Sequence, residues 1–492
     1  MRAGVSHGAG DGESKLKKVV IASACVLGIA AVAACSSGDA AAPVTAPVPD
    51  AGPPFVPGTL ALEVPCPDAV ADVYADPGAL PAEKGAILKC ARESDMSAAD
   101  IAAAVPGYTG RPFTSGAHVY RVLYRTERGD AAGSPGTSSA IVFIPTVPRT
   151  LPLPVVVVSH ATRGQGPNCA ASKLNELYQE GPLVGAGFAV IAPDLAGYAN
   201  YGAPGNPPNI YAGASEAGKS TLDGAKALRR MFATSLSSDV ILVGHSQGGF
   251  TALAALAQST TYDAGGTIAG VFAFAPLWLA QTSWGALSLR AKSFPFKDAR
   301  LANSVAIWYV YSHGEAFDGP GHGLDPFRPE KRDAVKNFAD SVCDDDSLGP
   351  LLAMGNDISE VYDPSFSNSV AFAAGTAGAC SDDVCEKWIA RFAADRPHLT
   401  GTAAKVPIMI AYGGMDPAIP AERMACVLDR LDTDTASYTL CLEPGADHLG
   451  VVYARSEYAA DWIAARTLGA AEPAACDAPF VRPACATPPP ND

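Results

Sequence analysis

Buried strands alternate with helices along much of this 492-residue chain, and this alternation limits the possible folds more than any other feature. Residues 152–160, 187–194 and 239–246 each contain an uninterrupted apolar run, which is typical of strands covered on both faces. Helix-forming stretches at 171–181 and 216–233 separate these runs. The pattern predicts an α/β fold with a mainly parallel sheet flanked by helices.

The same alternation continues in both directions from this central part. Two strand-like stretches, 117–128 and 138–145, come first and are joined by a turn rich in Gly, Ser and Pro, which indicates an antiparallel hairpin. A helix over 248–258 and a strand over 266–276 follow the third buried run. Near the C-terminus we expect two further strands and two further helices, at 406–416, 421–431, 436–443 and 451–468.

Between these two parts the alternation stops. Residues 277–402 contain Trp, Phe, Asp and Gly with helical patches but no run of buried strands, and we interpret them as an inserted cap or lid domain. The predicted organisation is therefore an N-terminal extension (59–116), a first core part (117–276), the cap, a second core part (403–470) and a disulfide-stapled tail (471–492).

A serine surrounded by glycines follows the third buried strand, in the pentapeptide Gly244-His245-Ser246-Gln247-Gly248. A G-x-S-x-G pattern alone is weak, but here a strand precedes it and a helix follows it, as in a nucleophile elbow. A Cβ at the flanking glycines would collide with the neighbouring strand or helix, and the helix N-terminus favours developing negative charge. We expect Ser246 to be a nucleophile rather than an inert residue of a glycine-rich turn.

A serine hydroxyl needs a base near pH 7. His448 lies in a loop after the last predicted strand and before the terminal helix, where the base belongs in the chain order Ser, acid, His. We therefore choose His448, with a solvated loop histidine as the alternative. The expectation for the other histidines is that they lie elsewhere: His245 points away from Ser246, and the rest are His7, His118, His160, His313, His322 and His398.

The acid that orients the histidine is expected at Asp416. This residue ends the strand 406–416 and therefore lies at the carboxyl edge of the sheet, where the sites of open α/β sheets gather. Asp447 adjoins His448, but sequence neighbours rarely point at each other. Asp432 and Asp434 lie at a helix end, and we interpret them as solvated.

An oxyanion hole requires two backbone N–H groups. One is expected from Gln247, the residue after the nucleophile, and the other from the polar, Gly-rich loop 159–170 after the first parallel strand. Thr162 is our candidate in that loop, with Ala161 second. The alternative is that the loop is only a turn.

These residues resemble the α/β-hydrolases, and more narrowly the secretory lipase group of bacteria and fungi. The likeness rests on four segments: the oxyanion loop SHATRGQGPNCA, the strand and loop GFAVIAPDLAGYANYG, the helix EAGKSTLDGAKALR and the elbow GHSQGG. The match covers most of residues 118–275 and 403–468, whereas the cap and the N-terminal part match poorly. Ala161 stands where that group usually has Gly. The resemblance implies an α/β-hydrolase fold and hydrolysis of a carboxylic ester through an acyl-enzyme.

The N-terminus has the features of an export signal. Lys15, Lys17 and Lys18 precede a short apolar run that ends in small residues, and the run is short for a membrane-spanning helix. The residues Val32-Ala33-Ala34-Cys35 resemble the lipobox of bacterial lipoproteins.

That resemblance implies a signal peptide over 1–34, a diacylglycerol on Cys35 and a flexible tether over 35–58, rich in Ala, Pro and Gly. The protein would then be exported to the cell envelope, on the outer membrane or cell surface, and held by lipid rather than by a spanning helix. The alternative is ordinary cleavage at an A-x-A site and release.

Ten cysteines remain after Cys25 and Cys35 are set aside, and an even number in an exported protein suggests five disulfides. Sequence does not fix the pairing, and zinc is disfavoured because no CxxC pair or clustered His accompanies them. We expect pairing mainly between near neighbours: Cys66–Cys90, Cys380–Cys385, Cys426–Cys441, Cys476–Cys485 and Cys169–Cys343.

Composition limits the other functions. The apolar fraction is 48% and charged residues are 17%, which predicts a globule, and the formal net charge of −15 argues against a nucleic-acid partner. We expect no metal or cofactor, although Ca²⁺ binding at 318–325 or 344–346 is an alternative. A serine peptidase with Glu216 as a peptide anchor, and a non-catalytic envelope binding protein, remain as other functions. Aromatic cap residues are candidates for an acyl pocket or for ordinary core: Trp278, Trp284, Phe294, Phe296 and Trp308.

Overall fold

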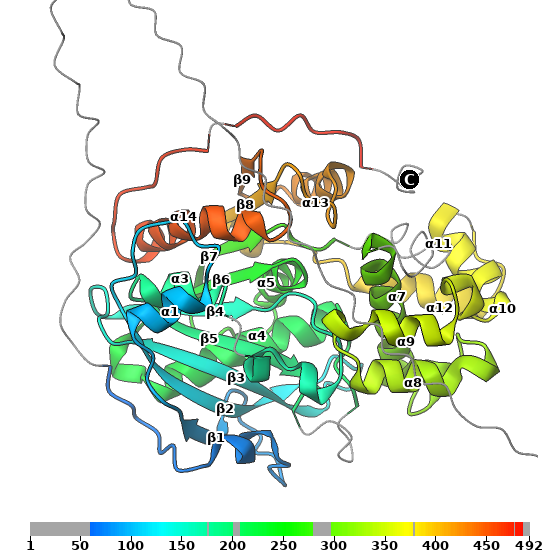
Figure 1. Cartoon of the computed structure of the whole chain (residues 1–492), viewed down its shortest axis with the longest axis horizontal. Helices are drawn as coiled ribbons and strands as arrows, with labels where there is room; N and C mark the ends of the chain where they lie inside the picture. The colour runs from blue at the N-terminus through cyan, green and yellow to red at the C-terminus, as the bar shows by residue number, and fades with distance from the viewer. Residues whose placement is uncertain are drawn as a thin grey trace, which may run out of the picture. The chain divides into compact units, whose positions relative to one another are not determined.

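The structure, a computed structural model, describes residues 60–174, 177–199, 207–278, 297–376, 379–476 and 478–485. The predicted signal peptide, Cys35 and the whole of the predicted tether (35–58) therefore lie outside the described residues, as do Trp284, Phe294 and Phe296. Figure 1 shows one large sheet with helices on both of its faces and a separate group of helices beside it. In the described part of the chain, no helix is long and apolar enough to cross a membrane.

The described strands form a single sheet in the order β1-β2-β3-β5-β4-β6-β7-β8-β9. β2 and β3 form the predicted antiparallel hairpin, β3 pairs antiparallel with β5, and every later pairing is parallel. β1 comes from the N-terminal extension, pairs antiparallel with β2 and was not predicted. The strands are β1 (Ile87–Arg92), β2 (Ala117–Glu127), β3 (Pro135–Pro145), β4 (Leu153–Ser159), β5 (Ala189–Ala196), β6 (Leu236–His245), β7 (Thr267–Phe274), β8 (Ile408–Gly413) and β9 (Tyr438–Glu443).

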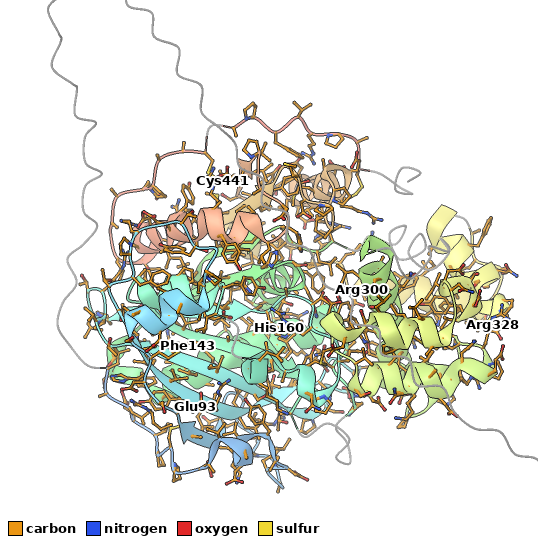
Figure 2. All side chains as sticks on the ribbon, in the orientation of Figure 1. Glu93, Phe143, His160, Arg300, Arg328 and Cys441 are labelled. Carbon is orange, nitrogen blue, oxygen red and sulfur yellow. A yellow bond between two sulfur atoms is a disulfide. The ribbon has the colours of Figure 1, made fainter. Side chains whose placement is uncertain are left out.

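Successive residues of each central strand enter different hydrophobic cores, which is why their sequences are apolar throughout. Val155 and Val157 of β4 pack in one core, and Val156 and Val158 pack in the other. In Figure 2, Phe143 and Cys441 mark the second of these cores at β3 and at β9. The helices of the sheet are α1 (Ala98–Ala104), α2 (Ala171–Leu174), α3 (Glu180–Gly185), α4 (Ala214–Met231), α5 (Gln247–Gln258), α13 (Ala421–Thr433) and α14 (Gly450–Thr467).

The helices divide between the two faces. Residues of α4, α5 and α13 pack in the first core, whereas residues of α1, α3 and α14 pack in the second. The stretch 171–181 was predicted as one helix, but its described residues, 171–174 and 177–181, include two helices, α2 and the start of α3. Helices on both faces leave the carboxyl ends of the parallel strands as the place where loops meet, and the candidate site lies there.

Between β7 and β8 the described chain is helical, as the sequence predicted. We call α7 to α12 (Lys297–Ala394) the helical segment, and its helices form the separate group in Figure 1. They share a third core, which contains Trp308, with Tyr211 and with Phe250 of α5. The helices are α7 (Lys297–Phe317), α8 (Arg332–Ser341), α9 (Leu348–Met354), α10 (Pro364–Phe366), α11 (Phe372–Thr376) and α12 (Asp383–Ala394).

The helical segment also makes polar contacts with the sheet's helices. The Asp395 carboxylate accepts a hydrogen bond from the backbone N–H of Ala214, the first residue of α4, at 2.9 Å. The same carboxylate binds His313 and the Tyr309 hydroxyl, each at 2.7 Å. A negative side chain at a helix N-terminus is favourable, so this cluster joins the helical segment to α4.

Five disulfides join the ten cysteines, and three of the predicted pairs are confirmed: Cys66–Cys90, Cys169–Cys343 and Cys380–Cys385. Two predicted pairs, Cys426–Cys441 and Cys476–Cys485, are wrong. Cys426 of α13 pairs with Cys485, and Cys441 of β9 pairs with Cys476. Nearness in sequence misled the prediction because the tail is fixed to the core at two points and is not closed on itself.

Candidate active site

Ser246 occupies the turn between β6 and α5 with a strained backbone. Its φ is 56° and its ψ is −117°, a region that non-glycine residues rarely adopt. Three backbone hydrogen bonds fix it: its N–H donates to Phe274 O at 2.9 Å, and its carbonyl accepts from Leu277 N at 2.8 Å and from Phe250 N at 3.1 Å. The residue is 8% exposed. The next residue, Gln247, begins α5, so backbone N–H groups without intrahelical partners surround this position.

The glycines of the elbow are required by space. A Cβ on Gly244 would lie 2.1 Å from the carbonyl oxygen of Gly248. A Cβ on Gly248 would lie 1.9 Å from the carbonyl oxygen of Ser159 and 2.8 Å from that of His160. The start of α5 is therefore pressed against the end of β4, just before the loop that contains Ala161 and Thr162.

Asp416 and His448 come together across the loops that follow β8 and β9. His448 Nδ1 lies 2.7 Å from Asp416 Oδ2, and the Asp416 side chain is fully buried. The other oxygen, Oδ1, accepts from the backbone N–H groups of Ala418 and Ile419 at 2.8 and 2.9 Å. A carboxylate held in this way orients the imidazole so that Nδ1 donates to it and Nε2 stays free to accept a proton.

The close approach of these two loops depends on glycine. A Cβ on Gly413 would lie 2.5 Å from Ala446 O, and one on Gly414 would lie 2.8 Å from Pro444 O. The sequence GGMD therefore lets the loop of Asp416 lie directly against the loop of His448.

His245 links the elbow to the loop of His448. Its Nε2 donates to the backbone carbonyl of His448 at 2.9 Å, and the two rings lie 4.5 Å apart. With Nε2 protonated, Nδ1 accepts from the Tyr178 hydroxyl at 3.3 Å. Burial and the neighbouring His448 hold the pKa of His245 well below its ordinary value, which keeps this ring neutral. Sequence reasoning gave no signal for Tyr178, which lies in a stretch predicted as plain helix.

The loop 159–170, which we call the oxyanion loop, is oriented by His160 at the peptide between Ala161 and Thr162. His160 Nδ1 donates to Ala161 O at 2.6 Å, and burial lowers the pKa of this histidine. Because the C=O and N–H of a trans peptide point in opposite directions, this bond turns the Thr162 N–H away from His160. Ala161 is not among the residues with positive φ, so alanine fits here without left-handed backbone.

Three other histidines in the described part of the chain bind carboxylates outside this site. His118 binds Asp95, His322 binds Asp325, and His398 binds Asp434. The interpretation of Asp434 as a solvated residue is wrong. Its side chain is fully buried and accepts from Leu399 N at 2.8 Å, because α13 ends against the chain that enters β8.

Asp432 and Asp447 also have structural partners. Asp432 pairs with Arg482 of the tail, and Asp447 accepts from Gly450 N at the start of α14, at 2.7 Å. Trp308 is fully buried in the third core, stacked on Phe338 with ring centroids 5.4 Å apart, which favours the core interpretation for this residue. Trp278 packs in the first core.

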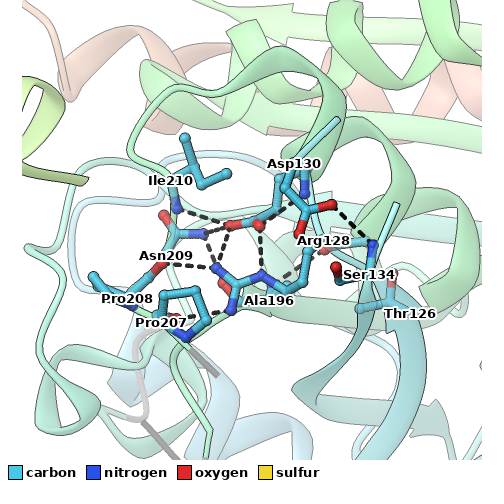
Figure 3. A network of polar contacts seen from close by, with 12 residues as sticks. Thr126, Arg128, Asp130, Ser134, Ala196, Pro207, Pro208, Asn209 and Ile210 are labelled. Atoms are coloured by element: carbon cyan, nitrogen blue, oxygen red, sulfur yellow. Dashed lines mark hydrogen bonds and ion pairs between the residues drawn. The ribbon is translucent and has the colours of Figure 1, made fainter. Parts of the chain in front are cut away.

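Glu216, the proposed peptide anchor, is wrong for that role. Its carboxylate is fully buried and binds Arg128, with Oε2 2.7 Å from Nε. It also accepts from Gly129 N at 3.0 Å and from Ile210 N at 2.8 Å, while Arg128 donates to Pro207 O and Pro208 O (Figure 3). Every polar atom of the pair is directed at the protein, so Glu216 holds residues 207–210 and does not face a ligand.

In 318–325, the first of the two segments considered for Ca²⁺ binding, Asp318 and Asp325 already have side-chain partners. Asp318 pairs with Lys387 and Arg391, so its carboxylate is not free for a cation. Across the residues that the structure describes, no group of three or more His, Cys, Asp or Glu side chains is arranged to hold a metal ion.

Comparison with known proteins agrees with this geometry. The family model for the alpha/beta hydrolase fold matches residues 154–454, which is more than half of the chain. The chain belongs to the α/β-hydrolase fold family. Among solved structures, this α/β hydrolase resembles the rice cell wall degrading esterase LipA from Xanthomonas oryzae, with a TM-score of 0.59 and 15% identity over 79% of this chain and 99% of the other.

Lipase A from Candida antarctica is a second similar structure. Its closed state has a TM-score of 0.54 and 16% identity, over 74% of this α/β hydrolase and 78% of the lipase. At such identities the likeness shows a shared fold. No curated protein matches the sequence of this hydrolase significantly.

Proposed function

We propose that this α/β hydrolase cleaves carboxylic esters through an acyl-enzyme, with Ser246, His448 and Asp416 as the catalytic residues. The observation that carries the proposal is the contact of His448 Nδ1 with the fully buried side chain of Asp416. The loop of His448 is in turn bound by His245, the residue before Ser246. The strained φ of Ser246 at the start of α5 supports its role as the nucleophile.

The reaction follows from the tautomer that Asp416 selects. His448 Nε2 takes the proton of the Ser246 hydroxyl as the oxygen attacks the ester carbonyl, and the tetrahedral oxyanion forms. The backbone N–H groups of Gln247 and Thr162 stabilise that oxyanion. His448 then gives its proton to the leaving alcohol. A water molecule, deprotonated by His448, attacks the acyl-enzyme, and His448 returns that proton to the Ser246 oxygen as the acid is released.

The named structural neighbours support an ester as the substrate, because one is described as an esterase and the other as a lipase. The likeness of the oxyanion loop and elbow to the secretory lipase group supports the same class. We further propose that the segment 277–402 acts as a cap over the site. A peptidase is less well supported, since its expected anchor Glu216 is buried in an ion pair.

A probe and a substrate series test the proposal. The protein without its first 58 residues is incubated with a fluorophosphonate probe and with p-nitrophenyl esters of increasing acyl length. We expect labelling and ester turnover, both lost in Ser246→Ala, and the length profile separates a lipase from a short-chain esterase. Peptide turnover without ester turnover would favour a peptidase. Absence of labelling in the parent protein would favour a binding protein and overturn the proposal.

We also propose that the protein is exported and that a lipid on Cys35 anchors it to the cell envelope. The five disulfides support export, because such bonds persist in oxidising compartments. Mass spectrometry of the N-terminal peptide from the native host tests the anchor. A diacylated Cys35 at the new N-terminus is expected, and an unmodified terminus produced by cleavage elsewhere would contradict it.

A further inference from the structure

The oxyanion loop is joined to the helical segment covalently and through its backbone. The disulfide Cys169–Cys343 connects the end of the loop to the chain after α8. Gly164 forms an antiparallel bridge with Cys343, and the N–H of Asp344 donates to Arg163 O at 3.1 Å. The residues that follow Thr162 are thus bound, one after another, to a part of the chain far away in sequence.

This contact is too close for side chains between the two backbones. Gly164 has a φ of 101°, and a Cβ there would lie 2.6 Å from Val342 O. A Cβ on Gly166 would lie 2.7 Å from Asp340 O. The glycines of the loop, which the sequence presented only as turn residues, let residues 340–344 seat directly on it.

Tyr211 makes a second connection, at Thr162 itself. Its hydroxyl lies 2.7 Å from Thr162 Oγ1, and its backbone N–H donates to Ser312 Oγ of α7 at 3.1 Å. Tyr211 is fully buried, with its ring 5.9 Å from that of Trp308. Burial raises the pKa of Tyr211 above its ordinary value, so the hydroxyl keeps its proton. One residue therefore binds both the helical segment and the predicted oxyanion donor.

We propose that the helical segment positions the oxyanion hole, with Tyr211 and the Cys169–Cys343 disulfide as the positioning residues for the Thr162 N–H. The inference rests on the proposed ester hydrolysis and extends it. Thr162 comes shortly after the end of β4, and Gly164 and Gly166 follow it in the chain. The helical segment supplies part of the contacts that hold the loop, directly through residues 340–344 and indirectly through Tyr211, so on this proposal the segment contributes to catalysis as well as covering the site.

The expected kinetic signature is a fall in kcat with little change in KM. Oxyanion donors act mainly on charge that develops in the transition state, so their displacement affects the chemical step and leaves ground-state binding alone. Because His448 and Asp416 belong to other loops, the pH dependence of kcat/KM should keep its shape. A general loss of structure would instead lower the active fraction and leave kcat per active site unchanged.

The chain contains a matched control for the disulfide. Cys380–Cys385 lies in the same helical segment but closes only a short loop beside α12. We compare Cys169→Ala/Cys343→Ala with Cys380→Ala/Cys385→Ala and with Tyr211→Phe, using a p-nitrophenyl ester and normalising kcat to the Ser246 labelled by the fluorophosphonate at completion. Loss of one oxyanion donor costs about 10²–10³ in kcat in other enzymes. For partial displacement we expect losses of about 10–100-fold for the first variant and about 3–10-fold for Tyr211→Phe, with the control within about twofold.

Tyr211→Phe keeps the ring in the third core, so it gives an answer even where the double cysteine variant folds poorly. The inference is overturned if both variants keep kcat within about twofold of the parent, or if the Cys380/Cys385 control falls as far as the Cys169/Cys343 variant. A parent without Ser246-dependent ester turnover would remove the proposed function, and the inference with it. An active parent, an inactive Ser246→Ala and unchanged positioning variants would remove the inference alone.

Discussion

The two halves of the candidate site are held by different parts of the chain. The acid–base half, Asp416 and His448, is fixed by backbone and side chains of the loops after β8, β9 and β6. The oxyanion half, around Thr162, is fixed by His160 and Tyr211 and also by residues that follow α8. The contacts cited for the first half all come from the sheet and its loops, whereas the second half also involves a helical segment inserted between β7 and β8.

This difference distinguishes two kinds of support within one site. On the proposals above, changes within the helical segment would be transmitted to the oxyanion loop through a disulfide, a backbone bridge and a buried tyrosine. Because we propose both a cap role and a positioning role for this segment, we expect catalytic strength and substrate access to be coupled in this chain.

The largest expected effect is in the acid–base half, for Asp416→Asn. The amide oxygen can still accept from Ala418 N and Ile419 N, but the amide nitrogen cannot accept from His448 Nδ1, so the wrong tautomer is favoured. We expect kcat to fall about 10⁴-fold, the size seen for the equivalent change in a serine protease, with unchanged unfolding. Asp447→Asn is the matched control, since it keeps its bond to Gly450 N, and ester kinetics compare the two. Equal activities would show that Asp416 is not the acid.

Glu216→Gln tests the buried ion pair with Arg128, which holds residues 207–210 just before Tyr211. Removing one charge of this fully buried pair leaves Arg128 without its counter-ion, and breaking such a pair costs about 3–5 kcal/mol of unfolding free energy. Glu127→Gln is the control, because its pairs with Lys84 and Lys219 are partly exposed and are worth about 0–1 kcal/mol. Denaturant unfolding measures both, and similar losses would contradict the special role of the buried pair.

Glu180, a buried carboxyl of α3, is expected to make the stability of the fold depend on pH. Burial raises the pKa of this carboxyl from 4.5 to about 7, and Arg163 of the oxyanion loop lowers it in part. The folded state then holds more protons than the unfolded state between these values, so stability falls as pH rises from about 4.5 to about 7. At about 1.4 kcal/mol for each pKa unit, the loss is about 3 kcal/mol.

Glu180→Gln removes this titration. Unfolding free energies measured from pH 4.5 to 8 should decline less steeply in the variant than in the parent, and the variant should be the more stable protein at pH 8. Parallel curves for the two proteins would show that Glu180 does not titrate in this range.

The smallest expected effect is for Tyr178→Phe, although the Tyr178 hydroxyl contacts both halves of the candidate site. Its hydroxyl donates to His245 and also contacts the backbone of Ala161, so its loss loosens each half slightly. One hydrogen bond is worth about 0.5–1.5 kcal/mol, which corresponds to a fall in kcat of about 2–10-fold. Tyr438→Phe, whose hydroxyl binds the exposed Asp432, should keep full activity. A Tyr178→Phe enzyme equal to its parent would mean that the halves are independent.

The acid–base half could be predicted from sequence because its signals are local. A buried run before GHSQGG, and an Asp and a His after later strands, place all three residues at one sheet edge. The support of the oxyanion half could not be predicted, because Tyr211, Ser312 and Cys343 are joined to the loop by tertiary contacts without a sequence pattern. Asp434 and the tail cysteines were misjudged for the same reason, since burial and pairing at long range leave no periodicity to detect. β1 was missed because its run is short and carries Lys89 and Arg92.

The course of the tail has a consequence for how the molecules behave at high concentration. β9 is the last strand of the sheet, and an edge strand offers unpaired backbone groups to any passing chain. Cys476 fixes the tail to the core on one face of β9, and Phe480 and Cys485 pack against the core on the other face. Cys476 and residues 478–485 therefore contact the core on both faces beside this edge, and a disulfide holds the tail at each end. Removal of the Cys426–Cys485 and Cys441–Cys476 disulfides would expose β9 to self-association, while the proposed catalytic residues stay in place.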